Sequence, residues 1–166
     1  MLPESNKSKE YSCNLTAIIP IADIAGRTGK LENILSQSSK SGVKIILVHD
    51  IQDQNNSLIL KKIFQKYCGE NDIYIEGYYG TAGQARNAGF QLCKTEWVCF
   101  WDSDDYVHVS EFFNMVKHAQ ESNCEIAIGL ISVKSENKET SPCLSDELIK
   151  NKFFTVIVLV CWVFSR

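Results

Sequence analysis

Five short runs of apolar and β-branched residues recur along the chain at nearly constant intervals, and few folds are compatible with that spacing. The runs are Leu15 to Ile21, Val43 to His49, Asp72 to Tyr78, Trp97 to Trp101 and Glu125 to Val133. Their starts are separated by 25 to 29 residues. Parallel neighbours in a sheet need a connection of about a dozen or more residues, whereas antiparallel neighbours can be joined by a short turn. The spacing therefore predicts parallel strands with a crossover helix between them.

The intervals between these runs carry helical periodicity. Apolar residues at helical spacing are Leu31, Ile34 and Leu35, then Leu58, Ile63, Phe64 and Tyr67, then Phe112, Met115, Val116 and Ala119. The continuous apolar character of Ile45 to Val48 and of Val98 to Trp101 is typical of strands that are covered on both faces. We therefore expect an α/β fold, a three-layer sandwich with a mainly parallel central sheet, in a Rossmann-like arrangement.

The composition limits the partners of such a domain. With 45% hydrophobic and 22% charged residues among 166, the chain can bury a core. Its formal net charge of -3 argues against nucleic acid as a partner, because phosphate backbones attract basic surfaces. The seven cysteines are odd in number and show no C-x-x-C spacing, so neither a zinc site nor a disulfide framework is indicated. We expect reduced cysteines, mostly in the core, as in cytosolic proteins.

We divide the chain into a polar extension over 1–14, a folded domain over 15–135 and a C-terminal segment over 136–166. Lys134 to Thr140 is polar and is predicted to be a loop. Phe153 to Phe164 is apolar apart from Thr155 but too short for a bilayer span, which takes about 20 residues. The first residues show no secretory signal. We expect a cytoplasmic protein, with contact to the inner face of the membrane left open.

Three carboxylates, Asp102, Asp104 and Asp105, directly follow the fourth apolar run. In open α/β sheets, ligands bind outside the carboxyl ends of the strands, which is where this cluster falls. Carboxylates so close together repel one another unless a cation lies among them, and oxygen ligands of this kind suit Mg²⁺ or Mn²⁺ that carries substrate phosphates. The alternative is a solvated acidic turn or a helix cap. The position after a buried strand favours a metal site.

Small residues fill the segment Gly83-Gln84-Ala85-Arg86-Asn87-Ala88-Gly89. The pattern predicts a helix that packs closely on the sheet and carries Arg86 and Asn87 in its first two turns. An arginine near a helix start suits a negatively charged ligand. Packing alone is the alternative, and the neighbouring acidic cluster favours a binding site.

Together these motifs resemble the family-2-type glycosyltransferases with the GT-A fold. The resemblance covers roughly residues 15 to 135 and rests on Ile18-Ile19-Pro20, Leu35-Ser36-Gln37, Ile46-Leu47-Val48-His49-Asp50, Ala85-Arg86-Asn87-Ala88-Gly89 and Phe100-Trp101-Asp102-Ser103-Asp104-Asp105. Arg-Asn-x-Gly followed shortly by Asp-Ser-Asp-Asp is specific as a combination.

The resemblance implies that a sugar is transferred, with inversion, from a nucleotide diphosphate donor, which we take to be a UDP-sugar, to a hydroxyl of a glycan, lipid or protein acceptor. It assigns the nucleotide to Pro20, Asp50, Arg86, Asn87 and Asp102, and a Mn²⁺ or Mg²⁺ ion to Asp102, Asp104 and Asp105. In such enzymes the residue that matches Asp50 holds the nucleobase. The metal bridges both phosphates and stabilises the charge on the departing diphosphate.

Two departures from the family pattern affect what we expect of this chain. His49-Asp50-Ile51-Gln52 stands where the family often has Asp-Asp-Gly-Ser, which bears on base selectivity. An inverting transferase also needs a carboxylate base for the acceptor hydroxyl, and family members carry it well downstream. Asp146-Glu147 lies too early in the chain to match that base, and we interpret it as the start of a helix, so the base is unassigned. We therefore expect a truncated chain whose C-terminal segment is an incomplete acceptor side.

Two other functions are compatible with the sequence. Without its base, the chain could be a nucleotide-sugar-binding domain or pseudoenzyme that performs no transfer. Asp102 and Asp104 could instead be the nucleophile and acid of a haloacid-dehalogenase-type phosphatase, but that fold places this strand first, and only 61 residues follow Asp105. Of the three histidines, His108 is close enough in sequence to the acidic cluster to be considered as a metal ligand.

Overall fold

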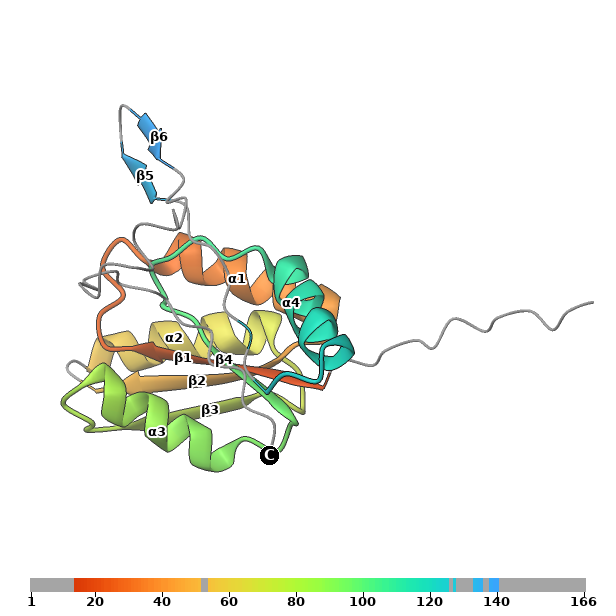
Figure 1. Cartoon of the computed structure of the whole chain (residues 1–166). Coiled ribbons are helices and arrows are strands. Elements are labelled where there is room, and N and C mark those ends of the chain that lie inside the picture. The colour runs from red at the N-terminus through yellow and green to blue at the C-terminus, as the bar shows by residue number, and fades with distance from the viewer. Residues whose placement is uncertain (1–13, 52–53, 126, 128–132, 136–137, 141–166) are drawn as a thin grey trace, which may run out of the picture.

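A computed structural model describes residues 14–51, 54–125, 127, 133–135 and 138–140 (Figure 1). Its elements are β1 (Leu15–Ile21), α1 (Thr28–Ser41), β2 (Lys44–Asp50), α2 (Gln54–Tyr67), β3 (Ile73–Gly77), α3 (Ala82–Leu92), β4 (Trp97–Phe100), α4 (Val109–Glu121), β5 (Val133–Ser135) and β6 (Lys138–Thr140). The alternation of strand and helix up to α4 confirms the predicted order.

The four strands β1 to β4 form one parallel sheet in the order β3-β2-β1-β4. Strand β1 lies inside the sheet, and Ile18 pairs with Ile46 of β2 on one side and with Phe100 of β4 on the other. All seven residues of β1 are buried. The backbone N–H of Trp101 donates to the carbonyl of Ile18 at 3.1 Å, so pairing with β1 continues past the end of β4. The acidic cluster therefore begins beside the carboxyl half of β1.

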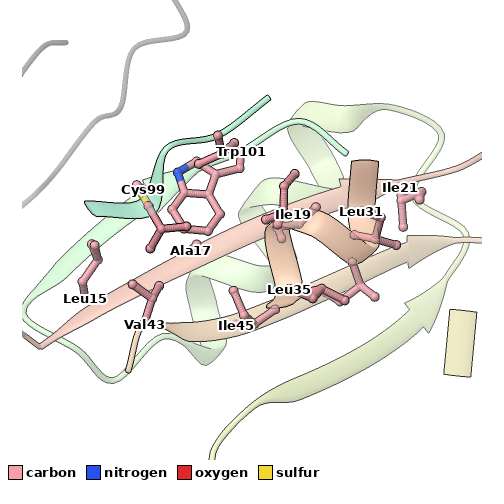
Figure 2. Close-up of a cluster of buried hydrophobic side chains, with 14 of the residues drawn as sticks. Leu15, Ala17, Ile19, Ile21, Leu31, Leu35, Val43, Ile45, Cys99 and Trp101 are labelled. Atoms are coloured by element: carbon pink, nitrogen blue, oxygen red, sulfur yellow. The ribbon is translucent and has the colours of Figure 1, made fainter. Parts of the chain in front are cut away.

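Helices cover both faces of this sheet, which gives the predicted three layers. Successive side chains of a strand point to opposite faces. Leu15, Ala17 and Ile19 of β1 lie in a hydrophobic cluster with buried residues of α1, α2 and α4. Figure 2 shows the members of this cluster on β1 and α1. Ile18 lies in a second cluster that includes Ala85 of α3. Figure 1 shows the same division, with α3 beneath the sheet and the other three helices above it.

Local signals in the sequence set the helix ends near the site. Helix α1 ends at Gly42, which has φ 79° and donates its N–H to the carbonyl of Ser38 at 3.1 Å. A left-handed residue of this kind is the usual stop signal of a helix, and glycine adopts it without a steric penalty. Helix α3 begins after Thr81, whose hydroxyl accepts the N–H of Gln84 at 3.2 Å. This cap fixes the amino end of the helix that carries Arg86.

Several sequence-based predictions need correction. Lys134 to Thr140 is not a plain loop, because β5 and β6 pair as an antiparallel hairpin. The residues of this hairpin are mostly polar, so the apolar pattern that predicts buried strands does not detect it. In α2, Leu58 is exposed and Leu60 is buried, so the core face is shifted. Cys93 and Cys99 are buried as expected, but Cys124 is exposed because it follows the end of α4.

Other predictions fall wholly or largely outside the described residues. These are the fifth strand, Asp146-Glu147 and the apolar tail. Within the described part of the chain, no helix combines the length and the apolar character that a bilayer crossing requires.

Gly89 brings α3 into direct backbone contact with the sheet. A β-carbon at this position would lie 2.6 Å from Cγ2 of Ile18 and 3.0 Å from Cγ2 of Val48. Both partners are buried, branched strand residues that cannot easily move aside. The close packing predicted from the small residues of α3 is therefore confirmed at this position.

We expect Gly89→Ala to lower the free energy of unfolding by about 1 to 2 kcal/mol, since overpacking outweighs the gain in helix propensity. Gly83→Ala in the same helix is the matched control, because the nearest atom to its added β-carbon is Thr81 Oγ1 at 4.0 Å. Urea unfolding of both variants measures the difference. Equal stability of the two variants would contradict the close contact.

Candidate functional site

A pocket of about 250 Å³ opens where the carboxyl ends of β1, β2 and β4 meet the amino end of α3. Its lining residues are Pro20, Ile21, Ala22, Arg27, Asp50, Thr81, Ala82, Ala85, Arg86, Asp102, Ser103 and Asp104. Parallel strands end at the same edge of a sheet, so residues far apart in sequence converge here.

The pocket gathers five of the residues that the sequence assigned to nucleotide or metal, namely Pro20, Asp50, Arg86, Asp102 and Asp104. The other two are not among its lining residues. Asn87 is exposed on α3, and Asp105 is half-buried next to the cluster. Because Asn87 follows Arg86 on the helix, the two side chains leave α3 in directions about 100° apart.

Asp50 ends β2 and holds the turn that leads into α3. Its Oδ1 accepts the backbone N–H of Tyr79 at 2.8 Å, and its Oδ2 accepts that of Gly80 at 3.0 Å. Gly80 has φ 73° and directly precedes Thr81, the cap of α3. The Asp50 carboxylate thus joins the end of β2 to the amino end of α3.

Arg86 forms an ion pair with the first carboxylate of the acidic cluster. Its Nη2 contacts Oδ1 of Asp102, and about a third of each side chain is exposed, 29% and 34% respectively. The Nε of Arg86 is buried and has no hydrogen-bond partner among the residues that the structure describes. The guanidinium is therefore anchored at one end and retains a donor that is still unsatisfied.

Two basic residues that the sequence analysis did not assign to the site contact Asp104. Nη2 of Arg27 lies 3.4 Å from Oδ2 of Asp104, and Nζ of Lys30 donates to the backbone carbonyl of Asp104 at 2.6 Å. Both belong to the segment that follows β1, at the same edge of the sheet. A basic residue in a glycine-flanked loop after the first strand was the signal that could have identified Arg27.

The acidic residues form a tight turn in which the N–H of Asp105 donates to the carbonyl of Asp102 at 3.2 Å. Burial raises the pKa of Asp105, and the negative charges of Asp102 and Asp104 raise it further, while Lys30 opposes them. The three carboxylates thus repel one another, which is the electrostatic situation that a bound cation relieves.

The donor set is chemically suited to Mg²⁺ or Mn²⁺, because carboxylate oxygens are hard ligands. In the part of the chain that the structure describes, however, no three Asp, Glu, His or Cys side chains are grouped closely enough to hold an ion. Asp102 and Asp104 are directed to Arg86 and Arg27. His108 is exposed at the start of α4. The metal assignment remains a prediction.

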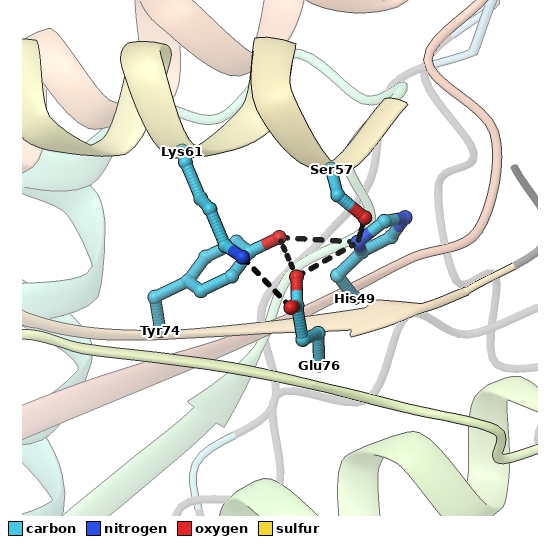
Figure 3. Close-up of polar contacts among 5 residues, drawn as sticks. All are labelled: His49, Ser57, Lys61, Tyr74 and Glu76. Carbon is cyan, nitrogen blue, oxygen red and sulfur yellow. Dashed lines mark hydrogen bonds and ion pairs between the residues drawn. The ribbon is translucent and has the colours of Figure 1, made fainter. Parts of the chain in front are cut away.

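A polar cluster around the buried His49 lies next to Asp50, between β2, β3 and α2, and its outer members Glu76 and Lys61 are partly exposed (Figure 3). The side chain of His49 is fully buried, and its Nδ1 lies 3.1 Å from the hydroxyl of Tyr74 and 3.5 Å from that of Ser57. The Tyr74 hydroxyl donates to Oε2 of Glu76 at 3.1 Å, and Lys61 donates to Oε1 at 2.7 Å. Because Tyr74 has one hydrogen, His49 donates from Nδ1 to the tyrosine oxygen.

This arrangement favours neutral His49. Its Nε2 is buried and has no partner within the described part of the chain, so a second proton on the ring would lack an acceptor there. Burial lowers the pKa of His49 from 6.5, although Glu76 and Asp50 oppose that change and Lys61 adds to it. The histidine that departs from the family pattern is therefore a core residue beside the pocket.

The chain is similar to known proteins over most of its length. The sequence matches Glycosyl transferase family 2 over residues 29–157, which is most of the chain. The chain belongs to glycosyl transferase family 2.

The relatives of this chain include proteins that are much longer than it. The minor teichoic acid biosynthesis protein GgaB of Bacillus subtilis (strain 168) is 27% identical over 153 residues, which cover 91% of this chain and 16% of GgaB. The structure of S. aureus TarS 1-349 in complex with UDP-GlcNAc has a TM-score of 0.58 at 22% identity, over 78% of this chain and 37% of TarS 1-349.

A mannosyltransferase, PcManGT from Pyrobaculum calidifontis, was solved with GDP-Man and Mn²⁺. It has a TM-score of 0.56 at 18% identity, over 66% of this chain and 33% of that chain. The two structural likenesses support the GT-A fold. This family 2 chain spans well under half of each of these proteins.

The buried His49 gives a testable pH dependence. Because the folded state lowers its pKa below 6.5, the unfolded chain binds the proton first as the pH falls. We expect the free energy of unfolding to decrease as the pH falls from about 7.5 to about 5.5, a range above the ordinary carboxyl pKa values.

His49→Asn should reduce this pH dependence, whatever it does to stability at neutral pH. His118→Asn is the control, since the His118 side chain is 79% exposed. Chemical unfolding at several pH values measures the slope. A slope that survives in His49→Asn would mean that other groups cause it.

Proposed function

We propose that this chain is the nucleotide-sugar-binding part of a metal-dependent, inverting glycosyltransferase that uses a UDP-sugar. The observation that carries the proposal is a single pocket that combines the acidic turn after β4, Arg86, Asp50 and the amino end of α3. The donors in the TarS and PcManGT structures, UDP-GlcNAc and GDP-Man, support a nucleotide diphosphate sugar. The Mn²⁺ named with PcManGT supports a divalent metal.

Each part of the pocket has a task in this proposal. Asp50 accepts a hydrogen bond from the nucleobase, and Pro20 lines the wall beside it. Asp102 contacts the ribose and, with Asp104 and Asp105, would hold Mn²⁺ or Mg²⁺. When bound, the ion supplies positive charge that stabilises the leaving diphosphate. Arg27 and Arg86 add positive charge at the same place. Asn87 does not line the pocket, and its assignment to the nucleotide rests on the family pattern alone.

For the acceptor, we propose a component of the cell wall. The name of GgaB supports an acceptor in teichoic acid biosynthesis. Asp146 and Glu147 lie outside the described residues, and we assign no catalytic base. The reduced cysteines of the core are compatible with a cytoplasmic enzyme. A chain that binds the donor without any transfer would instead be a binding domain.

The metal dependence can be tested by calorimetry with UDP in the presence of Mn²⁺ or of a chelator. We expect binding with Mn²⁺ and little or none with chelator, because the acidic turn repels phosphates. Asp104→Ala should weaken binding roughly tenfold or more, which corresponds to about 1.4 kcal/mol. Glu96→Ala is the control for charge, since Glu96 is exposed just before β4, at the other end of the strand. Equal affinity with and without the ion would refute metal-assisted binding.

Asp50→Asn tests the assignment of the nucleobase. Uracil presents an N–H at ring position 3 of its pairing edge, which a carboxylate accepts, whereas cytosine presents a lone pair there. An amide can donate to that lone pair. We expect the variant to bind UDP more weakly and to lose preference for UDP over CDP, with its requirement for Mn²⁺ intact. An unchanged preference would remove Asp50 from base recognition.

A further inference from the structure

We infer that Gly80, which is not among the residues that line the pocket, sets the base selectivity of this site by fixing the carboxylate of Asp50. Gly80 is a positioning residue in this scheme, and Asp50 is the group that touches the base. The inference rests on the proposed function, since it concerns the nucleotide that the pocket would bind.

The carboxylate of Asp50 is held at both oxygens. Oδ1 accepts from Tyr79 N–H at 2.8 Å and Oδ2 from Gly80 N–H at 3.0 Å, so the plane of the carboxylate cannot turn without breaking a hydrogen bond. A carboxylate oxygen has a second lone pair, so each oxygen can accept one more donor. Asp50 lines the pocket. The remaining lone pairs therefore have a fixed direction before any ligand arrives.

A fixed acceptor discriminates between bases better than a mobile one. A donor such as the uracil ring N–H meets an acceptor already in place, and the cost of ordering the side chain has been met on folding. A base that presents a lone pair instead places one acceptor against another, and the two repel because the held carboxylate cannot rotate away. The chemistry of this clamp selects bases with a ring N–H on their pairing edge, such as uracil, over cytosine.

Glycine is needed at position 80 because of the backbone and not because of space. Its φ is 73°, a left-handed conformation, and an added β-carbon would meet only Oε1 of Gln84 at 3.5 Å. A β-carbon disfavours this conformation by about 1 to 2 kcal/mol. Alanine would therefore shift φ toward negative values, turn the Gly80 N–H away from Oδ2 and free one end of the carboxylate.

Gly42 offers a matched control for the strain. It has φ 79°, and none of the described residues would lie within 4 Å of a β-carbon there. It lies between α1 and the start of β2, at the opposite end of that strand from Asp50. Gly42→Ala therefore imposes a similar backbone penalty without reaching the pocket.

The experiment uses the full 166-residue chain with Mn²⁺ and compares Kd values for UDP and CDP by calorimetry, alongside thermal melts. We expect Gly80→Ala and Gly42→Ala to lower the melting temperature by similar amounts. The preference for UDP over CDP should fall about three- to tenfold in Gly80→Ala and stay at the wild-type value in Gly42→Ala. Gly80→Asn should keep most of the preference, because asparagine tolerates the left-handed conformation.

Three results would overturn the inference. They are an unchanged preference in folded Gly80→Ala, an equal loss of preference in Gly42→Ala, and a wild-type chain that binds UDP and CDP equally. If Gly80→Ala does not fold, Gly80→Asn is the deciding variant. A Gly80→Asn chain that keeps the wild-type melting temperature but loses its preference for UDP over CDP would contradict the role of the turn. A wild-type chain that binds neither nucleotide overturns the proposed function itself, and the clamp with it.

Discussion

The site depends on the burial of β1 between two parallel neighbours. Each of its residues is buried, and its two edges are paired with β2 and β4. Water is excluded from this strand on both faces and both edges, so its register with its neighbours is strongly fixed. That register brings the ends of β1, β2 and β4 to one edge, where Asp50 and Asp102 line the same pocket although 52 positions separate them. The chemistry of the site is thus a consequence of hydrophobic burial elsewhere.

The charges around the pocket are balanced locally. Asp50 is neutralised in part by two backbone N–H groups, Asp102 by Arg86, and Asp104 by Arg27. Asp105 is half-buried beside two like charges, and its pKa is raised for both reasons. Arg27 and Arg86 thereby reduce the repulsion within the acidic turn. A cation that entered the turn would compete with the two arginines for the same carboxylates, which would free guanidinium groups for an anionic ligand.

Periodicity in the sequence predicted the fold well because burial on both faces leaves a clear pattern. The strand limits of β1 and the three-layer arrangement agree with the structure. The hairpin of β5 and β6 was missed, since short polar strands carry no such pattern. For the site, the sequence identified five lining residues but could not reveal the pairing of Arg27 with Asp104 or the two bonds that hold Asp50. Those contacts depend on loop geometry, which periodicity does not encode.

The contact at Gly89 links the sheet to the pocket mechanically. Helix α3 rests on Ile18 and Val48 with its backbone, without a flexible side chain between them. Arg86 precedes Gly89 by one turn of that helix. Tightly packed interiors have low compressibility and transmit strain. A substitution that changes the shape of Ile18 would therefore shift α3 and displace the guanidinium of Arg86 that contacts Asp102. The geometry of the pocket can thus change without a change in any residue that lines it.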